Sequence, residues 1–157
     1  MLDRKVDGVT AFSPYVMTTL LRSGWSEDYR FDPTMFVRSL TSAGFEVSTT
    51  AMDFLTRFGN LRVTCKHPNI DSVTQQAKFI VEGRIQLLLP EVALLKDQLG
   101  RLVYYVGSAR DYDMSLYIDT YGKMYGTWED SGYFLGADAN DALENLILGK
   151  ELEIVLE

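Results

Sequence analysis

The chain contains one cysteine, one histidine and no long apolar run, and each shortage excludes a class of protein. The single thiol, Cys65, has no partner for an intramolecular disulfide, which agrees with a reducing compartment. A membrane-spanning helix needs about 18 to 20 apolar residues, whereas the densest apolar patch is the leucine triplet at 87–89. The first eight residues also lack the basic and apolar regions of a secretion signal. We therefore expect a cytoplasmic protein that makes no membrane contact.

Basic residues are scarce in the last third of the chain. Residues 1–103 carry 12 Lys and Arg against 11 Asp and Glu, whereas residues 104–157 carry 3 against 11, a net charge of −8. Binding to a phosphate backbone exchanges counterions for Lys and Arg, so this balance predicts no direct contact with nucleic acid. An excess of acid on one part of a protein favours encounter with a basic partner instead.

Length and composition predict one folded domain. The 157 residues are 46% hydrophobic and 24% charged, which is ordinary for a soluble globular protein. A chain of this length buries about two thirds of its extended surface, enough for a core without disulfides or metals. We expect a single domain over residues 1–157.

Apolar periodicity predicts helices first, then a series of short strands, then a last helix. The helices begin near Ser13-Pro14, Asp32-Pro33, Thr49, Pro90 and Asp138. The strands cover residues 62–66, 102–106, 114–119, 123–128 and 132–135, with a hairpin turn at 119–122. Residues 72–82 fit either a helix or a strand. This order predicts an α+β fold, with an antiparallel or mixed sheet and helices mainly on one side.

The stretch 49–63 is the best-defined helix-to-strand unit. Its apolar residues occur at i, i+3, i+4 and i+7 and form one stripe, namely Ala51, Phe54, Leu55 and Phe58. Thr50 or Ser48 is suited to cap its start. We expect Gly59 to end the helix in the left-handed conformation, followed by Asn60, which also tolerates positive φ.

Several short motifs recur in a fixed order between residues 23 and 150. They are Gly24-Trp25, Arg30, Asp32-Pro33, Gly44-Phe45, the run Phe54-Leu55-Phe58-Gly59-Leu61, Ile118-Asp119 with Gly122, Leu135-Gly136, Ala142-Leu143 and Leu148-Gly149-Lys150. Together they resemble the third subfamily of the SUKH superfamily, the Smi-and-Knr-like domains known as immunity proteins of bacterial polymorphic toxin systems. Where that family usually has Gly-Gly after the phenylalanine, this chain has Gly59-Asn60.

The resemblance implies a non-catalytic protein that binds a cognate toxin, and in this superfamily the toxins are frequently nucleases. It does not specify the contact residues, because such proteins vary their surfaces to match different toxins. Fungal relatives imply a second class, an intracellular scaffold or regulatory adaptor. No cofactor is implied.

Two patterns are suggestive of catalysis. Cys65 and His67 would face the same side of a strand, but with no separate orienting acid they do not form a nucleophile triad. We expect them at a surface or edge, and zinc would need four ligands. Asp111 and Asp113 have the Asp-x-Asp spacing that some enzymes use to hold a divalent metal, which leaves a small metal-dependent hydrolase as the weakest alternative. The commoner interpretation is a solvated loop.

Aromatic and acidic residues alternate over the strand region, and we expect some of them to form a partner-binding surface. About half of the tyrosines should instead face the core. Trp25 is expected to be buried, and Asp138, Asp141 and Glu144 to be solvated charges on the last helix. The predicted contact residues are Asp111, Tyr112, Asp113, Trp128, Glu129, Asp130 and Tyr133.

Overall fold

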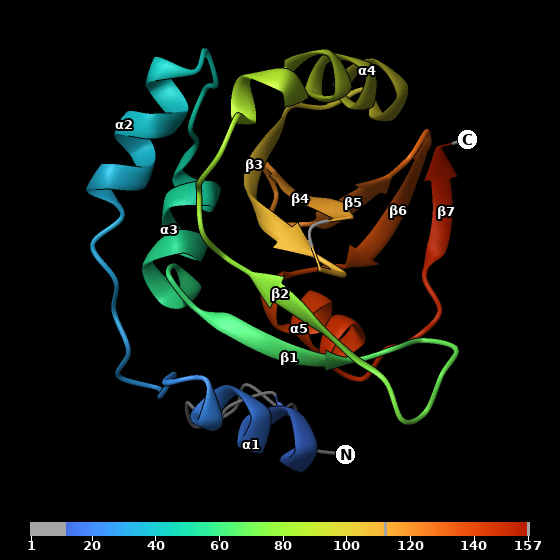
Figure 1. The fold of residues 1–157 in the computed structure, drawn as a ribbon. Coiled ribbons are helices and arrows are strands. Elements are labelled where there is room, and N and C mark those ends of the chain that lie inside the picture. Colours follow the sequence, from blue (N-terminus) through green and yellow to red (C-terminus); the bar gives the residue numbers. More distant parts are fainter. Residues whose placement is uncertain (1–11, 112, 157) are drawn as a thin grey trace.

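A computed structural model describes residues 12–111 and 113–156, and within them it shows an open sheet of seven strands with helices on both faces (Figure 1). The strands are β1 (Arg62–Lys66), β2 (Thr74–Lys78), β3 (Val103–Ala109), β4 (Met114–Asp119), β5 (Met124–Trp128), β6 (Ser131–Gly136) and β7 (Glu153–Leu156). Spatial order follows chain order, and every neighbouring pair is antiparallel. The predicted α+β class is confirmed.

The helices divide unequally between the two faces of the sheet. They are α1 (Pro14–Arg22), α2 (Thr34–Ser42), α3 (Thr49–Phe58), the 3₁₀ helix η2 (Ile85–Leu88), α4 (Leu89–Leu99) and α5 (Ala139–Ile147). Helices α1, α3 and α5 share one face, with α2 outside α3, while α4 covers the other (Figure 1). A Cβ added to Gly136 would meet the Ala142 nitrogen of α5 at 2.4 Å. On the opposite face, Thr127 Oγ1 donates to Glu91 of α4 at 2.7 Å.

The predicted stripe of α3 enters the core, where aromatic rings join three parts of the chain. Phe58 stacks on Trp25 at 5.9 Å between ring centroids and meets Phe79, just after β2, edge-on at 6.4 Å. The Trp25 indole Nε1 donates to the Arg57 carbonyl at 3.1 Å, so its polar atom is satisfied. Both the buried stripe and the buried Trp25 are confirmed.

The ends of α3 resolve one open alternative and correct one expectation. Ser48, not Thr50, accepts the hydrogen bond from the Ala51 amide at 3.1 Å. Gly59 has φ −58° and is not left-handed, whereas Asn60 has φ 68°. Glycine is still required at 59, because an added Cβ would lie 2.2 Å from the Leu55 carbonyl oxygen. The helix ends by close packing at Gly59, and the turn is made by Asn60.

The other helix starts are only partly as expected. Ser13 precedes α1, but its side chain makes no capping bond. Its backbone amide donates to Glu144 Oε2 at 2.7 Å, so Glu144 is a buried link between α1 and α5 and not a solvated charge. Pro33 occupies the N-cap position of α2, and Asp32 Oδ1 accepts from the Thr34 amide at 3.0 Å. Asp138 caps α5 through the Asp141 amide at 2.8 Å.

Two strands complete the sheet beyond those expected. The ambiguous segment 72–82 contains β2, which pairs with β1 from Arg62↔Lys78 to Lys66↔Thr74. The short strand β7, which was not predicted from the sequence, pairs with β6 at Gly132↔Leu156. Across the described residues 12–111 and 113–156, no helix has the length and apolar content that crossing a bilayer requires.

Candidate functional site

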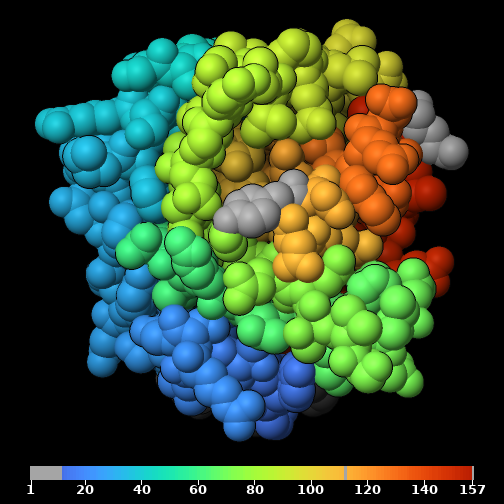
Figure 2. All heavy atoms as spheres, viewed as in Figure 1, coloured from blue at the N-terminus to red at the C-terminus, as the bar shows by residue number. Residues whose placement is uncertain are grey.

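The antiparallel order places three hairpin loops at one end of the sheet, which we call the turn end. They are the β1–β2 loop at 67–73, the β3–β4 turn at 110–113 and the β5–β6 turn at 129–130. Strand β7 finishes at the same end, because Leu156 pairs with Gly132 at the start of β6. Figure 2 shows the segments of the β3–β4 and β5–β6 turns, in shades of orange, beside each other on one face.

The β3–β4 turn is tied to β2 by an acidic side chain. The Asp111 amide donates to the Gln76 carbonyl at 3.1 Å, and the Gln76 amide donates back to Asp111 Oδ1 at 2.8 Å. Both Arg110 and Asp111 have positive φ, 50° and 56°. The Asp113 side chain is exposed, and its amide donates to the Arg110 carbonyl at 3.1 Å. The predicted contact residue Tyr112 lies outside the described residues.

Arg110 connects this turn to the β5–β6 turn. Its guanidinium carbon lies 5.8 Å from the centroid of the Trp128 ring, a cation–π distance. Burial lowers the pKa of Arg110, and the nearby Tyr133 opposes that shift. Trp128 is 39% exposed and Tyr133 is half-buried, while Glu129 and Asp130 are both exposed. The structure thus places Asp111, Asp113, Trp128, Glu129 and Asp130 together at the turn end, with Tyr133 close to Arg110.

Three other acidic or aromatic residues of the strand region, Asp119, Tyr121 and Tyr125, do not belong to this surface. Asp119 is fully buried, and its Oδ1 accepts from the backbone amides of Tyr121 and Lys123 at 2.8 and 3.0 Å. Its Oδ2 accepts from Arg101 at 3.2 Å, which raises the pKa of that guanidinium. Tyr125 is buried beside it, and Tyr121 is exposed at the opposite end of the sheet.

The two patterns suggestive of catalysis have structural roles. Cys65 lies on β1, an edge strand as expected, but its side chain is buried rather than at the surface, and burial raises the pKa of the thiol to about 12. His67 Nδ1 accepts from the amides of Asn69 and Ile70 at 3.0 and 3.2 Å and so organises the loop after β1. Among the described residues, no group of three His, Cys, Asp or Glu side chains is arranged to hold a metal ion, and Asp111 is already bonded to β2.

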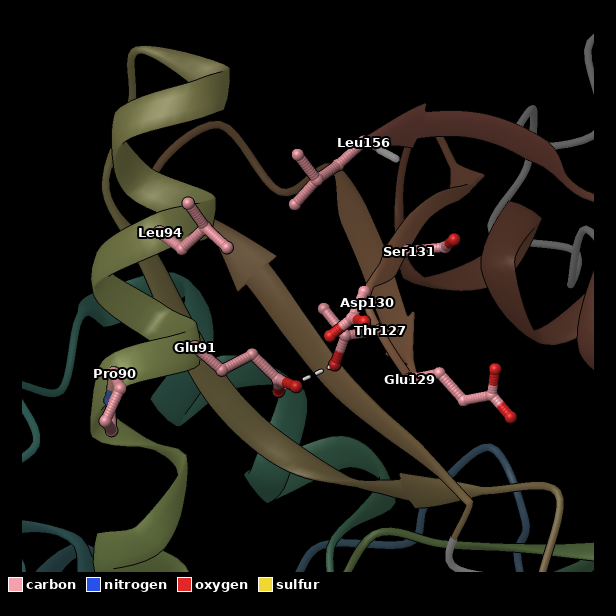
Figure 3. Close-up of a pocket in the computed structure, with 8 residues that line it drawn as sticks. All are labelled: Pro90, Glu91, Leu94, Thr127, Glu129, Asp130, Ser131 and Leu156. Atoms are coloured by element: carbon pink, nitrogen blue, oxygen red, sulfur yellow. Dashed lines mark hydrogen bonds between the residues drawn. The ribbon is translucent and has the colours of Figure 1, made fainter.

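A pocket of about 220 Å³ lies beside the β5–β6 turn, and most of its residues were not expected from the sequence. Figure 3 shows it between α4 on one side and the ends of β5, β6 and β7 on the other. Its apolar lining residues are Pro90, Leu94 and Leu156. Its polar lining residues are Glu91, Thr127, Glu129, Asp130 and Ser131. Glu129 and Asp130 therefore belong to both the turn-end surface and the pocket.

Glu91 is the most constrained acid of this pocket. Its Oε2 accepts hydrogen bonds from the Tyr117 hydroxyl and, at 2.7 Å, from Thr127 Oγ1. Burial is the main cause of a raised pKa at Tyr117, and the nearby Glu91 charge adds to it. Tyr105 lies beside Tyr117, and its pKa is raised to about 12, chiefly by burial and then by Glu82 and Glu91. Both phenols therefore stay protonated and Tyr117 remains a donor, which fixes the carboxylate of Glu91.

No sequence signal could have identified this pocket. Glu91 follows Pro90 in the first turn of a helix, an ordinary position for an acid near a helix N-terminus. Its partners come from β4 and β5, 26 and 36 residues later. Only the sheet register, which pairs Tyr117 with Tyr125 and Ser115 with Thr127, brings them under α4.

Comparison with known proteins agrees with this fold and its motifs. The family model described as SUKH-3 immunity protein matches residues 12–149. No curated protein and no solved structure matches the chain. The family match covers the helices α1 to α5 and the strands β1 to β6, and on that ground the chain belongs to the SUKH-3 immunity protein family.

Proposed function

We propose that this protein acts in the cytoplasm as an immunity protein that binds and neutralises a cognate toxin domain and performs no bond chemistry itself. The contact surface is the turn end, with Asp111, Asp113, Trp128, Glu129, Asp130 and Tyr133. The single observation that carries this choice is that two separate acidic turns lie on one face of the molecule and are joined through Arg110 and Trp128.

The charge of the surface indicates the class of toxin. A nuclease active site is basic because it holds phosphate, so an acidic cover matches it in charge and speeds association. The described turn-end residues Asp113, Glu129 and Asp130 are all exposed, and the chain carries a net charge of −7. This charge supports a nuclease as the toxin. It does not favour nucleic acid or a membrane as a direct partner.

Aromatic side chains supply the contact area that charges alone do not. Interface hot spots are enriched in Trp, Tyr and Arg. Trp128 presents 39% of its surface while Arg110 holds the ring from the adjacent turn. An aromatic anchor that is already positioned loses little conformational freedom when it binds.

Co-expression with the toxin domain encoded beside this gene tests the proposal. The test variant combines Asp113→Lys, Glu129→Lys and Asp130→Lys, and it leaves Asp111 unchanged because that side chain bonds to β2. We expect loss of rescue and of measurable affinity, with an unchanged melting temperature, because the three side chains are exposed.

The matched control reverses three exposed acids far from the turn end, Glu27→Lys, Asp28→Lys and Glu46→Lys. It changes the net charge by the same amount, so retained rescue would show that the position of the acids matters and not the overall charge. Rescue by the turn-end variant at the level of the unmodified protein would contradict the acidic surface. Failure of the unmodified protein to rescue, with a non-toxic partner found in the same cell, would favour the adaptor.

A further inference from the structure

We infer that the pocket between α4 and the β5–β6 turn receives an arginine side chain of the toxin. This inference rests on the proposed function for the identity of the partner, but its chemistry rests on the pocket alone. The pocket combines a fixed carboxylate, a second acid and apolar walls in about 220 Å³.

The carboxylates provide the polar end of the site. The hydroxyls of Tyr117 and Thr127 both donate to Glu91 Oε2, and none of the described residues donates to Oε1. Asp130 lines the same pocket, whereas Figure 3 shows the Glu129 side chain pointing away from α4. A guanidinium carries five N–H donors in a planar fork that suits carboxylate oxygens. Glu91 Oε1 and the carboxylate of Asp130 can therefore share one guanidinium.

The walls and the volume suit one side chain. Pro90, Leu94 and Leu156 are apolar and line the pocket, so they match the methylene stem of a long cationic residue. Pockets that enclose whole small molecules usually measure about 300 to 1,000 Å³. At about 220 Å³ this pocket is below that range.

Arginine fits better than lysine or a metal ion. An ammonium group is compact and strongly hydrated, whereas a guanidinium is weakly hydrated and tolerates apolar walls. A divalent cation such as calcium requires six or more oxygen ligands, and the described residues offer no metal-binding group of His, Cys, Asp or Glu. The hydroxyls of Tyr117 and Thr127 hold Glu91 in place before binding, which lowers the entropic cost of the ion pair.

An NMR titration of the full chain tests the pocket without any toxin. The probes are Nα-acetyl-arginine N-methylamide, the matching lysine derivative and the matching leucine derivative. We expect saturable amide shifts with the arginine probe only, confined to the residues around 91–94 and 127–131, with a dissociation constant of about 1 mM or weaker. Equal shifts with lysine, or shifts spread over the surface, would overturn the assignment to arginine.

The variants Glu91→Gln and Glu27→Gln form a matched pair. Glutamine at 91 keeps an oxygen for the Tyr117 and Thr127 hydroxyls but removes the charge, so we expect arginine binding to weaken about tenfold or more. Glu27 is exposed and does not line the pocket, so its variant should weaken binding by about twofold at most. Equal effects of the two substitutions would contradict a specific pocket.

Toxin binding separates this inference from the proposed function. If the turn end binds the toxin and the pocket holds one of its arginines, Glu91→Gln should lower affinity about 10- to 100-fold, and one Arg→Ala change in the toxin should remove that sensitivity. Unchanged toxin affinity of Glu91→Gln would reject the pocket and leave the proposed function intact. Absence of any toxin binding by the unmodified chain would reject the proposed function, whatever the arginine probe shows.

Discussion

The two faces of the central sheet bury different kinds of side chain. Towards α3 and α5, the cross-strand pairs are apolar, such as Ile118 with Met124, and Gly126 leaves room for Met114. Towards α4, the same strands present a row of tyrosines, Tyr105, Tyr117 and Tyr125, and beside it a row of hydroxyls, Ser108, Ser115 and Thr127.

The two faces also differ in how completely helices cover them. Three helices cover the apolar face, where the aromatic rings pack without gaps that any described pocket reaches. The polar face is covered by α4. The Glu91 pocket lies on this face, and so does a hollow of about 470 Å³ lined partly by Tyr105, Ser108 and Ser115. Most of the polar side chains on this face are buried, and several of them line these pockets.

The largest expected effect is on the apolar face. Phe58→Ala removes a fully buried ring that contacts Trp25, Phe54 and Phe79, and such a cavity costs about 3 to 5 kcal/mol. Urea denaturation should show this loss, while Leu21→Ala, at a residue 53% exposed on α1, should change stability by less than about 0.5 kcal/mol. A small effect of Phe58→Ala would mean that the aromatic cluster does not hold the helices to the sheet.

A smaller loss is expected at the buried acid that closes the β4–β5 turn. Asp119→Ala removes the acceptor for two backbone amides and for Arg101, and we expect a loss of about 2 to 3 kcal/mol in urea denaturation. Arg101 is 34% exposed, so Arg101→Ala should cost much less than Asp119→Ala, because solvent screens an exposed guanidinium. If the two substitutions lowered stability equally, the carboxylate would stabilise the fold through its ion pair with Arg101 and not through its hydrogen bonds to the turn amides.

Stability at alkaline pH tests the burial of one titrating side chain on each face, a thiol on the apolar face and a phenol on the polar face. On the apolar face, Cys65 has its pKa raised from 9.0 to about 12, and on the polar face Tyr105 has its pKa raised from 10.0 to about 12. Above each ordinary value the unfolded chain loses a proton that the folded chain keeps, so the unfolded state binds fewer protons and stability falls as pH rises. Each group contributes at most about 1.4 kcal/mol per pH unit.

Chemical denaturation at a series of pH values between 8 and 11 measures this fall in stability. Between pH 9 and 10 the loss belongs mainly to Cys65, so Cys65→Ala should flatten that interval. Above pH 10, Tyr105→Phe should reduce the slope further. A stability that stays constant up to pH 11 would mean that neither group is buried as the structure has it.

The sequence pattern was sufficient to predict those elements that depend on residues close together in the chain. The α3 stripe and the hairpin turn closed by Gly122, which has φ 91°, both depend on neighbouring residues. Strand β7 was not predictable in the same way, because this four-residue strand pairs with residues of β6 that lie 19 to 24 positions earlier in the chain, from Phe134↔Glu153 to Gly132↔Leu156. The ambiguous residues 72–82 became a strand for a similar reason, the partner strand β1.

The candidate site likewise has features that could be predicted from neighbouring residues and features that depend on distant contacts. Charge and aromatic content identified the two turns, since hairpin turns between short strands are local features. Burial of Asp119 and Glu144 was not foreseen, because each is fixed by a distant contact, with Arg101 and with the Ser13 amide. Glu91 could not be identified from the sequence, because its significance depends on strands that follow it.

The smallest expected effect concerns the β5–β6 turn itself. Glu129 has φ 56° and lies between the paired residues Trp128 and Ser131, with Asp130 outside the positive-φ set. Positive φ at the first of two central residues is the pattern of a type II′ turn, where glycine is usual. Glu129→Gly should therefore raise stability by about 0.5 to 1 kcal/mol, whereas Asp130→Gly should lower it slightly through added freedom of the unfolded chain.

Thermal unfolding of both variants beside the unmodified protein checks this, with toxin affinity as the second measurement. A more stable Glu129→Gly that binds the toxin less well would show that this turn keeps a strained acid for recognition. If Glu129→Gly is instead destabilised as Asp130→Gly is, the positive φ carries no strain. The acid at 129 would then need no functional reason to be there.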